Sequence, residues 1–277
     1  MNEAPQALPV PVEAPGSPWQ SFSAAVQFLT RIPMQSAPVS AAALRGSTVY
    51  FPLVGGLIGA STAALIWLGM LVWPAWLAVL VGLSVEAWLT GGMHEDAVAD
   101  FCDAFGGGWT RERILEILKD SRVGSHGVLG LLAAIGLRGG ATIALINFYS
   151  ATPLHWVTAL IAGSAVGRWS MVLAMATVAP VSNREGLARD VGRRVTPVDL
   201  ALASFWGLLC LLPFAVFHPL HLLLATTVLS LVIWRFLAMV QAKIGGTTGD
   251  CLGCLGYLAH VAFLLAAAAR LQSGGPA

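Results

Sequence analysis

The sequence predicts an all-α fold, a polytopic integral membrane helical bundle of about seven transmembrane helices that is preceded by an N-terminal interfacial helix. Composition is the first reason, because 57% of the 277 residues are hydrophobic and only 10% are charged, whereas about 25% are charged in an ordinary soluble domain. The second reason is that several apolar stretches reach the ~17–25 residues that a helix needs to cross the hydrocarbon core. The third is that basic residues gather in alternate connections between these stretches.

Each element follows from its local pattern. Residues 1–17 are rich in Pro and Ala and predict a disordered tail. From residue 18, apolar side chains recur at helical intervals, which is typical of a helix at the membrane interface. Transmembrane spans are expected at about residues 49–73, 75–92, 127–147, 155–178, 200–217, 220–240 and 251–269, of which the second and the seventh are short and interrupted by glycine. Residues 18–270 then form one membrane-embedded domain, and residues 271–277 form a short tail.

Charge supports this order of spans. The segments before residue 49 and over residues 91–126, 179–199 and 241–250 hold eleven of the 15 Lys and Arg residues, and the turns on the other side hold none. Because basic residues in short loops mark the cytoplasmic side, we expect the charged loops to face the cytoplasm. No basic region followed by an apolar run opens the chain, so we expect no cleavable signal peptide. A net charge of +1, without a basic patch that contains aromatic residues, excludes a nucleic acid partner.

The stretch over residues 91–109 contains a cluster of carboxylates. Asp96, Asp100 and Asp103 are spaced at i, i+4 and i+7, so on a helix they share one face. No basic residue occurs between residues 91 and 110 to neutralise them. Oxygen ligands without sulfur or nitrogen favour a hard cation such as Mg²⁺, and the alternative is a plain acidic loop. Glu95 and His94 point away from this face, and His94 is expected to cap the helix or to support the site.

Two further segments combine cations with small residues. "KDSRVGSHG" supplies Lys119 and Arg122 with Asp120 between them, and an arginine fork beside accessible backbone N–H groups is suited to binding phosphate. The alternative is a basic anchor at the membrane surface. "KIGGTTGDCLG" adds Lys243 and Asp250, which are either a further part of the site or members of a simple turn.

Two arginines lie inside predicted spans. Arg138 and Arg168 each cost about 2.5–3.5 kcal/mol at the centre of a membrane helix unless they are paired. Glu86, in the second span, and an anionic substrate are the candidate partners. Structural pairing is expected for Arg138, and a functional role has more weight for Arg168. The loop over residues 183–194 holds four arginines, which either recruit phosphate or only signal topology.

Carboxylates that bind magnesium, cations and a membrane setting together indicate phosphoryl transfer. The spacing D-x-x-x-D-x-x-D resembles that of the CDP-alcohol phosphotransferases, although Ala97 replaces the glycine and Asp100 the arginine of that motif. A CDP-alcohol-type phospholipid synthase is therefore an alternative function. A polytopic transporter is another, but it would place its ionisable groups near the bilayer midplane in broken helices.

A closer resemblance rests on three motifs in order. "LTGGMHEDAVADFCDAFGGGW", "RERILEILKDSRVGSHG" and "KIGGTTGDCLG", with "FLTRIPM" before them, strongly resemble the cobalamin synthase family, the adenosylcobinamide-GDP ribazoletransferases, over about residues 19–265. The resemblance implies a Mg²⁺-dependent phosphotransferase of the bacterial inner membrane. Its members join adenosylcobinamide-GDP to α-ribazole, or to its 5′-phosphate, and release GMP in the last steps of vitamin B12 biosynthesis. By analogy, association with other late-pathway enzymes and homo-oligomers are expected.

The resemblance also implies roles for individual residues. Matched to the family motifs by position, Asp96, Asp100 and Asp103 would be the metal ligands, and His94, the segment Lys119 to Arg122 and Asp250 would belong to the site. From the residues themselves, we expect substrate to be bound by His94, Lys119, Ser121, Arg122, Arg168 and Lys243, and the candidate acceptors of the hydroxyl proton are Glu95, Asp120 and Asp250. The choice among these three acceptors stays open. The chain departs from the family pattern at residues 97 and 98, where Ala-Val stands in place of Gly-Leu.

Overall fold

The computed structural model describes residues 17–34, 40–181 and 195–270 of the chain. Within these ranges the regular structure is helical, apart from one β-bridge between Pro180 and Thr247, and the predicted all-α fold is confirmed. The predicted tails over residues 1–17 and 271–277, except for Ser17, and the arginine-rich loop over residues 183–194 lie outside the described residues.

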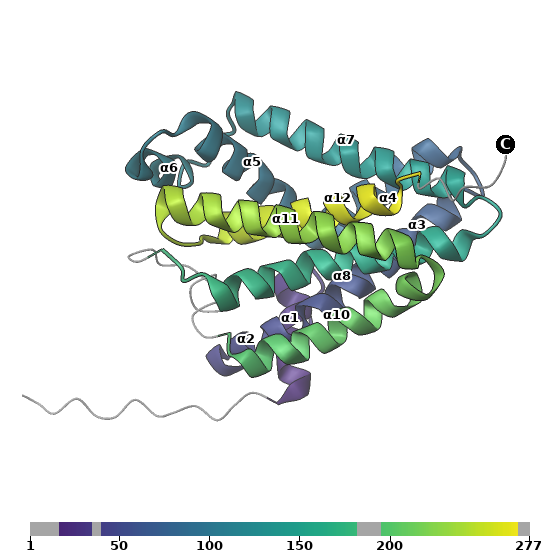
Figure 1. Ribbon diagram of the computed structural model, residues 1–277, viewed down its shortest axis with the longest axis horizontal. Helices are drawn as coiled ribbons and strands as arrows, with labels where there is room; N and C mark the ends of the chain where they lie inside the picture. The colour runs from purple at the N-terminus through teal and green to yellow at the C-terminus, as the bar shows by residue number, and fades with distance from the viewer. Residues whose placement is uncertain (1–16, 35–39, 182–194, 271–277) are drawn as a thin grey trace, which may run out of the picture.

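Twelve helical elements follow one another in the described ranges (Figure 1). They are α1 (Pro18–Leu29), α2 (Ala41–Ser47), the short 3-10 helix η1 (Thr48–Tyr50), α3 (Phe51–Gly69), α4 (Ala75–Thr90), α5 (Met93–Gly107), α6 (Arg111–Ile117), α7 (Ser125–Phe148), α8 (Pro153–Thr177), α10 (Pro197–Phe217), α11 (Pro219–Ile244) and α12 (Gly249–Ala267). The helix expected from residue 18 is α1, which begins with a capping box between Ser17 and Gln20.

Six helices are long and apolar enough to cross a membrane, and a bent pair brings the number to seven. The six are Ala42–Gly69, α7, α8, α10, α11 and α12, which confirms the multi-pass bundle. The second predicted span, residues 75–92, is corrected: α4 ends at Thr90 after 16 residues, or about 24 Å of helix, and α5 turns from it by 89°. The turn occurs where Gly91 and Gly92 have φ angles of 76° and 68°, a conformation that side chains disfavour.

The centre of the bundle consists of α8 and α12. α8 packs against α3, α10 and α12, and α12 also packs against α5 and α11. Small residues allow the close approach: a Cβ atom at Gly59 of α3 would lie 2.6 Å from the Leu160 carbonyl of α8, and one at Gly167 of α8 would lie 2.6 Å from the Gly256 carbonyl of α12. Small residues at helix interfaces are typical of packing within membranes.

The segments that are rich in charge meet at one end of the bundle, on the left in Figure 1. The Arg111 side chain of α6 donates to the Ile244 carbonyl at the end of α11 over 3.0 Å. The Thr247 amide donates to the Ala179 carbonyl, and the Val181 amide donates to the Thr247 carbonyl, both over 3.0 Å. We call this region, formed by α5, α6 and the residues that join α11 to α12, the charged end.

Candidate active site

α5 carries the carboxylate cluster at the charged end. It begins directly after the Gly91–Gly92 turn, and Glu95 and Asp96 lie in its first turn, where the helix dipole favours negative charge. The expectation that Asp96, Asp100 and Asp103 lie on a single helix is confirmed. Their surroundings differ, however, because Asp96 is exposed, Asp100 is half-buried and Asp103 is buried.

Asp103 joins α5 to the start of α7. Its two carboxylate oxygens accept hydrogen bonds from the amide of Gly124 over 2.6 Å and from the amide of Gly127 over 2.8 Å. Both positions need glycine, because a Cβ atom at either one would overlap the Asp103 carboxylate. The third aspartate of the motif therefore holds the segment "KDSRVGSHG" against the acidic helix.

Negative charge accumulates around Asp100. Burial, followed by the charges of Asp96, Asp250 and Asp103, raises the pKa of the Asp100 carboxyl to about 6. Within the described ranges, no Lys or Arg forms an ion pair with an α5 aspartate. These ranges also contain no group of three His, Cys, Asp or Glu side chains already arranged to hold a metal ion. The metal site formed by the three aspartates therefore stays a prediction. The negative charge that a bound cation would neutralise is nevertheless concentrated around Asp100.

Asp250 lies beside this cluster, in the first turn of α12. Thr248 caps that helix by accepting from the Cys251 amide, and its hydroxyl also donates to the Asp250 carboxylate over 3.4 Å. α12 approaches α5 closely, since a Cβ atom at Gly253 would lie only 2.6 Å from the Ala97 Cβ atom. The alanine at position 97 thus fits because its neighbour on α12 is a glycine.

The basic residues lie on the surface of the charged end. Arg122 forms a two-pronged ion pair with Asp120, with distances of 2.9 Å from Nε to Oδ1 and 2.6 Å from Nη2 to Oδ2. The bond to Arg122 lowers the pKa of the Asp120 carboxyl to about 2, so Asp120 is a weak proton acceptor. Lys119 and Ser121 are exposed. Lys243 reaches α5, where its Nζ donates to the Phe105 carbonyl over 3.4 Å.

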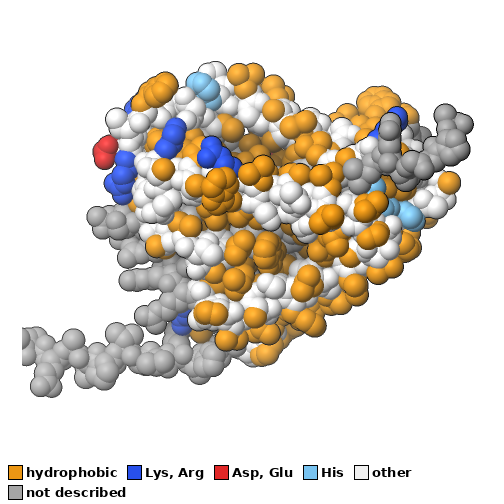
Figure 2. Space-filling model, in the orientation of Figure 1, with side chains coloured by type: hydrophobic (Ala, Val, Ile, Leu, Met, Phe, Trp, Pro, Cys, Tyr) orange, Lys and Arg blue, Asp and Glu red, His pale blue; other side chains and the backbone are white. Residues whose placement is uncertain are grey.

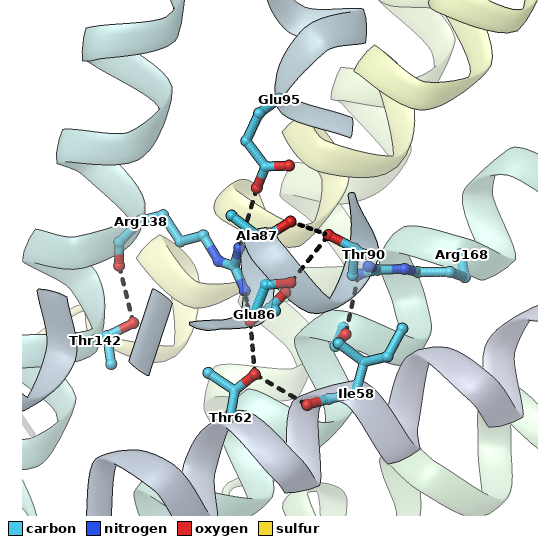
Figure 3. Close-up of polar contacts among 10 residues, drawn as sticks. Ile58, Thr62, Glu86, Ala87, Thr90, Glu95, Arg138, Thr142 and Arg168 are labelled. Carbon is cyan, nitrogen blue, oxygen red and sulfur yellow. Dashed lines mark hydrogen bonds and ion pairs between the residues drawn. The ribbon is translucent and has the colours of Figure 1, made fainter. Parts of the chain in front are cut away.

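Behind α5, inside the bundle, a buried ion pair joins three helices (Figure 3). Arg138 of α7 pairs with Glu86 of α4, and its other terminal nitrogen lies 3.9 Å from a carboxylate oxygen of Glu95 in α5. Glu86 also accepts a hydrogen bond from the Thr62 hydroxyl over 2.7 Å. The expected structural pairing of Arg138 with Glu86 is confirmed, and the same arginine links α4 to α5 across their bend.

Arg168 has a different environment. It is 4% exposed and donates to the Ser164 hydroxyl over 3.0 Å, but no carboxylate of the described chain lies within ion-pair distance. Nearby ring nitrogens are also without partners: the Nε2 atoms of His94 and His260 are buried and form no hydrogen bond in the structure. The sequence reasoning missed His260, for which the only signal was a polar ring within an apolar span.

The predicted site residues thus form three groups. Asp96, Asp100, Asp103, Asp250 and Lys243 gather around α5, whereas Lys119, Asp120, Ser121 and Arg122 form a surface segment that is linked to them through Asp103. The third group faces the interior of the bundle. It consists of His94 and Glu95 on the inner side of α5 and Arg168 of α8. An arrangement of several carboxylates beside exposed cations is suited to binding a phosphate ester together with a cation.

Comparisons with known proteins agree with one another. The family model described as cobalamin-5-phosphate synthase matches residues 21–268. The chain is 34% identical to an adenosylcobinamide-GDP ribazoletransferase of Leptospira interrogans over 242 residues, which cover 85% of this chain and 89% of that protein. It is 35% identical to the protein of the same name from Leptothrix cholodnii over 251 residues, covering 88% and 93% of the two chains. No solved structure matches the chain.

Proposed function

Because the chain belongs to the cobalamin-5-phosphate synthase family, we propose that it joins adenosylcobinamide-GDP to α-ribazole, or to its 5′-phosphate, and releases GMP. The ribazole 3′-hydroxyl oxygen bonds to the phosphorus that carries the aminopropanol arm. The bond between this phosphorus and the bridging oxygen breaks, GMP leaves with that oxygen, and the hydroxyl proton passes to a carboxylate. The observation that supports this chemistry is the acidic face of α5, whose aspartates form no ion pair with a Lys or Arg of the described residues, beside an exposed basic segment.

We propose Asp96, Asp100 and Asp103 as the residues that hold Mg²⁺. Their oxygen donors and their unneutralised charge suit a hard cation. Each Asp103 oxygen accepts one amide hydrogen bond and keeps a second lone pair, so these contacts would orient Asp103 as a ligand rather than block it. When bound, Mg²⁺ supplies positive charge that stabilises the negative oxygens of the diphosphate.

The surface cations would bind the phosphates of the donor substrate. Lys119, Ser121, Arg122 and Lys243 offer N–H and O–H groups at the charged end. Arg122 would exchange the Asp120 carboxylate for a phosphate of similar geometry, because a guanidinium fork fits both. Inside the bundle, His94 Nε2 and Arg168 Nε are buried and form no hydrogen bond within the described residues. This supports a role for both residues in binding an anionic group that reaches between the helices.

Asp250 is the proton acceptor that we propose among the three candidates. Asp120 is held by Arg122 at a pKa of about 2 and is therefore a poor base, whereas Glu95 lies 3.9 Å from the buried Arg138 behind α5. Asp250 adjoins the aspartates of α5 from the first turn of α12. A base must be within reach of the proton that it accepts, and the place of Asp250 beside the acidic face supports this role.

The charged end would face the cytoplasm of a bacterial inner membrane. Five of the 15 Lys and Arg residues of the chain lie in the segments over residues 91–126 and 241–250 that meet there, and the positive-inside rule assigns such segments to the cytoplasmic side. Polar substrates would then reach α5 from the cytoplasm.

The experiment that tests the proposed function is a GMP-release assay on the purified protein in liposomes. Both substrates are supplied together and singly, with Mg²⁺ or with EDTA. We expect release only when both substrates and Mg²⁺ are present. Asp96→Asn and Asp100→Asn should each lower turnover about 100-fold, because each removes a carboxylate that would hold the Mg²⁺ ion. Full turnover by these variants at saturating Mg²⁺ would disprove the metal assignment, and no release by folded wild-type protein would disprove the transferase.

A further inference from the structure

An apolar groove lies between α10 and α11, on the face that is shown in Figure 2 with hydrophobic side chains over most of it. The two helices follow each other in the chain but have different main partners: α10 packs on α8 and α3, whereas α11 packs on α12. They enclose a cavity of 560 Å³. A second apolar hollow of 420 Å³ continues from it along α10 and shares Leu208, Leu211 and Leu222 with it.

The groove lies among exposed apolar side chains of α10 and α11, such as Leu208 and Leu223. Its lining includes Trp169 of α8, Leu208 of α10 and Trp234 of α11, and the few polar groups in it are hydroxyls such as those of Ser204 and Thr226. The Ser204 hydroxyl accepts from the Trp169 indole over 2.9 Å, and the Thr226 hydroxyl donates to the Leu223 carbonyl over 3.0 Å. These hydroxyls therefore already have partners within the protein, and the groove is suited to a hydrocarbon chain.

Arg235 follows Trp234, the last residue of α11 that lines the groove. It is exposed, and its guanidinium carbon lies 5.8 Å from the centre of the Trp234 ring, which lines the groove. No carboxylate in the described part of the chain forms an ion pair with it. An unpaired arginine at the centre of a membrane helix costs about 2.5–3.5 kcal/mol, and the proposed reaction does not use this residue.

The position of Arg235 along α11 points to the headgroup layer. α11 has 26 residues and is about 39 Å long, which exceeds the ~30 Å hydrocarbon core. Arg235 lies nine residues before the end of the helix, about 14 Å from the charged end. If α11 extends equally past both sides of the core, the backbone of Arg235 lies about 9 Å inside the hydrocarbon. From this depth the long arginine side chain extends its charge toward the interface.

We propose that the groove and Arg235 together bind one anionic phospholipid. An acyl chain would occupy the cavity between α10 and α11, and the headgroup phosphate would accept hydrogen bonds from the guanidinium of Arg235, whose fork matches phosphate. A lipid with net negative charge is favoured over a zwitterionic one, because the ammonium group of a zwitterionic headgroup already balances its phosphate. This site is separate from the proposed active site at α5.

A second copy of the chain fits the groove less well. Residues 200–240, which form most of α10 and α11, contain no Asp or Glu. A copy that packed face to face through these helices would bury Arg235 without a carboxylate partner, and an unpaired buried charge is strongly unfavourable.

Native mass spectrometry of the purified protein in detergent tests the proposal without any substrate. The protein is titrated with phosphatidylglycerol or with phosphatidylcholine, and bound lipid is counted. Arg235→Gln removes the charge and Arg235→Lys retains it. Thr226→Trp fills the groove, and Thr227→Trp is its matched control, because both threonines are exposed and donate to the Leu223 carbonyl but only Thr226 lines the groove.

We expect one phosphatidylglycerol to bind in preference to phosphatidylcholine. Arg235→Gln should weaken this binding about tenfold, as the loss of a charged hydrogen bond predicts, and Thr226→Trp should abolish it, whereas Arg235→Lys and Thr227→Trp should retain it. Equal binding of the two lipids, or no effect of Arg235→Gln, would overturn the proposal. So would a dimer that Thr226→Trp dissociates and Thr227→Trp does not, because the groove would then hold a second copy. None of these outcomes depends on GMP release. The lipid site can therefore be disproved without disproving the proposed function, and the reverse also holds.

Discussion

At the scale of single residues, the contact of Asp103 with two backbone amides depends on glycine. Gly127→Ala would place a methyl group against the Asp103 carboxylate, and forcing that overlap should destabilise the fold by about 1–3 kcal/mol. The displaced segment should also lower GMP release. Gly136→Ala is the matched control on the same helix, since a Cβ atom there meets nothing within 4 Å. Thermal unfolding in detergent and GMP release should change in the first variant and stay near wild type in the second.

The proton acceptor can be tested through two aspartates. Since the pKa of Asp120 is lowered to about 2, this group is ionised at every pH above about 4 and does not titrate in the working range of an enzyme. Asp120→Asn should therefore leave kcat and its pH profile nearly unchanged and act mainly on KM. Asp250→Asn should lower kcat about 100-fold or more, as the loss of a general base predicts. Kinetics from pH 5 to pH 8 distinguish the two, and a reversed pattern would assign the base to Asp120.

Some residue contacts could be predicted from sequence and others could not. The pairing of Arg138 with Glu86 was predictable, because a charge in an apolar span needs an opposite charge and only one acidic residue occurs in the adjacent span. The contact between Asp103 and the amides of Gly124 and Gly127 was not, since backbone N–H groups leave no trace in the side-chain pattern. Arg235 was missed because a single charge did not interrupt the apolar run over residues 220–240.

At the scale of helices, Arg138 of α7 contacts both sides of the bend between α4 and α5, through Glu86 and Glu95. Removing one member of a buried pair costs about 3–5 kcal/mol, whereas replacing both members with apolar residues can be neutral. Glu86→Leu alone and Arg138→Met alone should each destabilise the protein strongly, and the double variant should recover much of the loss.

Unfolding in a detergent series measures the coupling between Glu86 and Arg138. Additive losses in the double variant would mean that the two side chains do not act as a pair. GMP release by the double variant gives a second readout. If it folds but turns over slowly, the charge of Arg138 beside Glu95 orients α5 as well as stabilising the fold.

The positions of the helices could be predicted from the sequence more completely than the bend between α4 and α5. Apolar length was enough to predict α7, α8, α10, α11 and α12, because a helix that crosses a bilayer must satisfy its own backbone. The apolar pattern predicts the second span over residues 75–92 as one segment. Its end at Thr90 depends on the left-handed conformation of both Gly91 and Gly92, and glycine permits that conformation without requiring it.

At the scale of the whole molecule, the orientation in the membrane can be measured by labelling. Trp109 is 92% exposed at the charged end, and Val72 is 76% exposed in the turn between α3 and α4. A membrane-impermeant maleimide applied to intact cells should label Val72→Cys but not Trp109→Cys, and both should react after the cells are opened. Both variants are made in a chain without its four native cysteines. The opposite pattern would place the charged end outside the cytoplasm.

The turn of 89° at the start of α5 has a consequence for how the substrates arrive. If α5 continued in the direction of α4, its aspartates would follow the line of a membrane-crossing helix, and a nucleotide-bearing corrinoid would have to shed its hydration to meet them. Instead, the acidic helix α5 lies nearly perpendicular to α4, at the charged end of the bundle. With the charged end in the cytoplasm, as proposed, a bulky water-soluble reactant would reach the proposed catalytic carboxylates without crossing the hydrocarbon core.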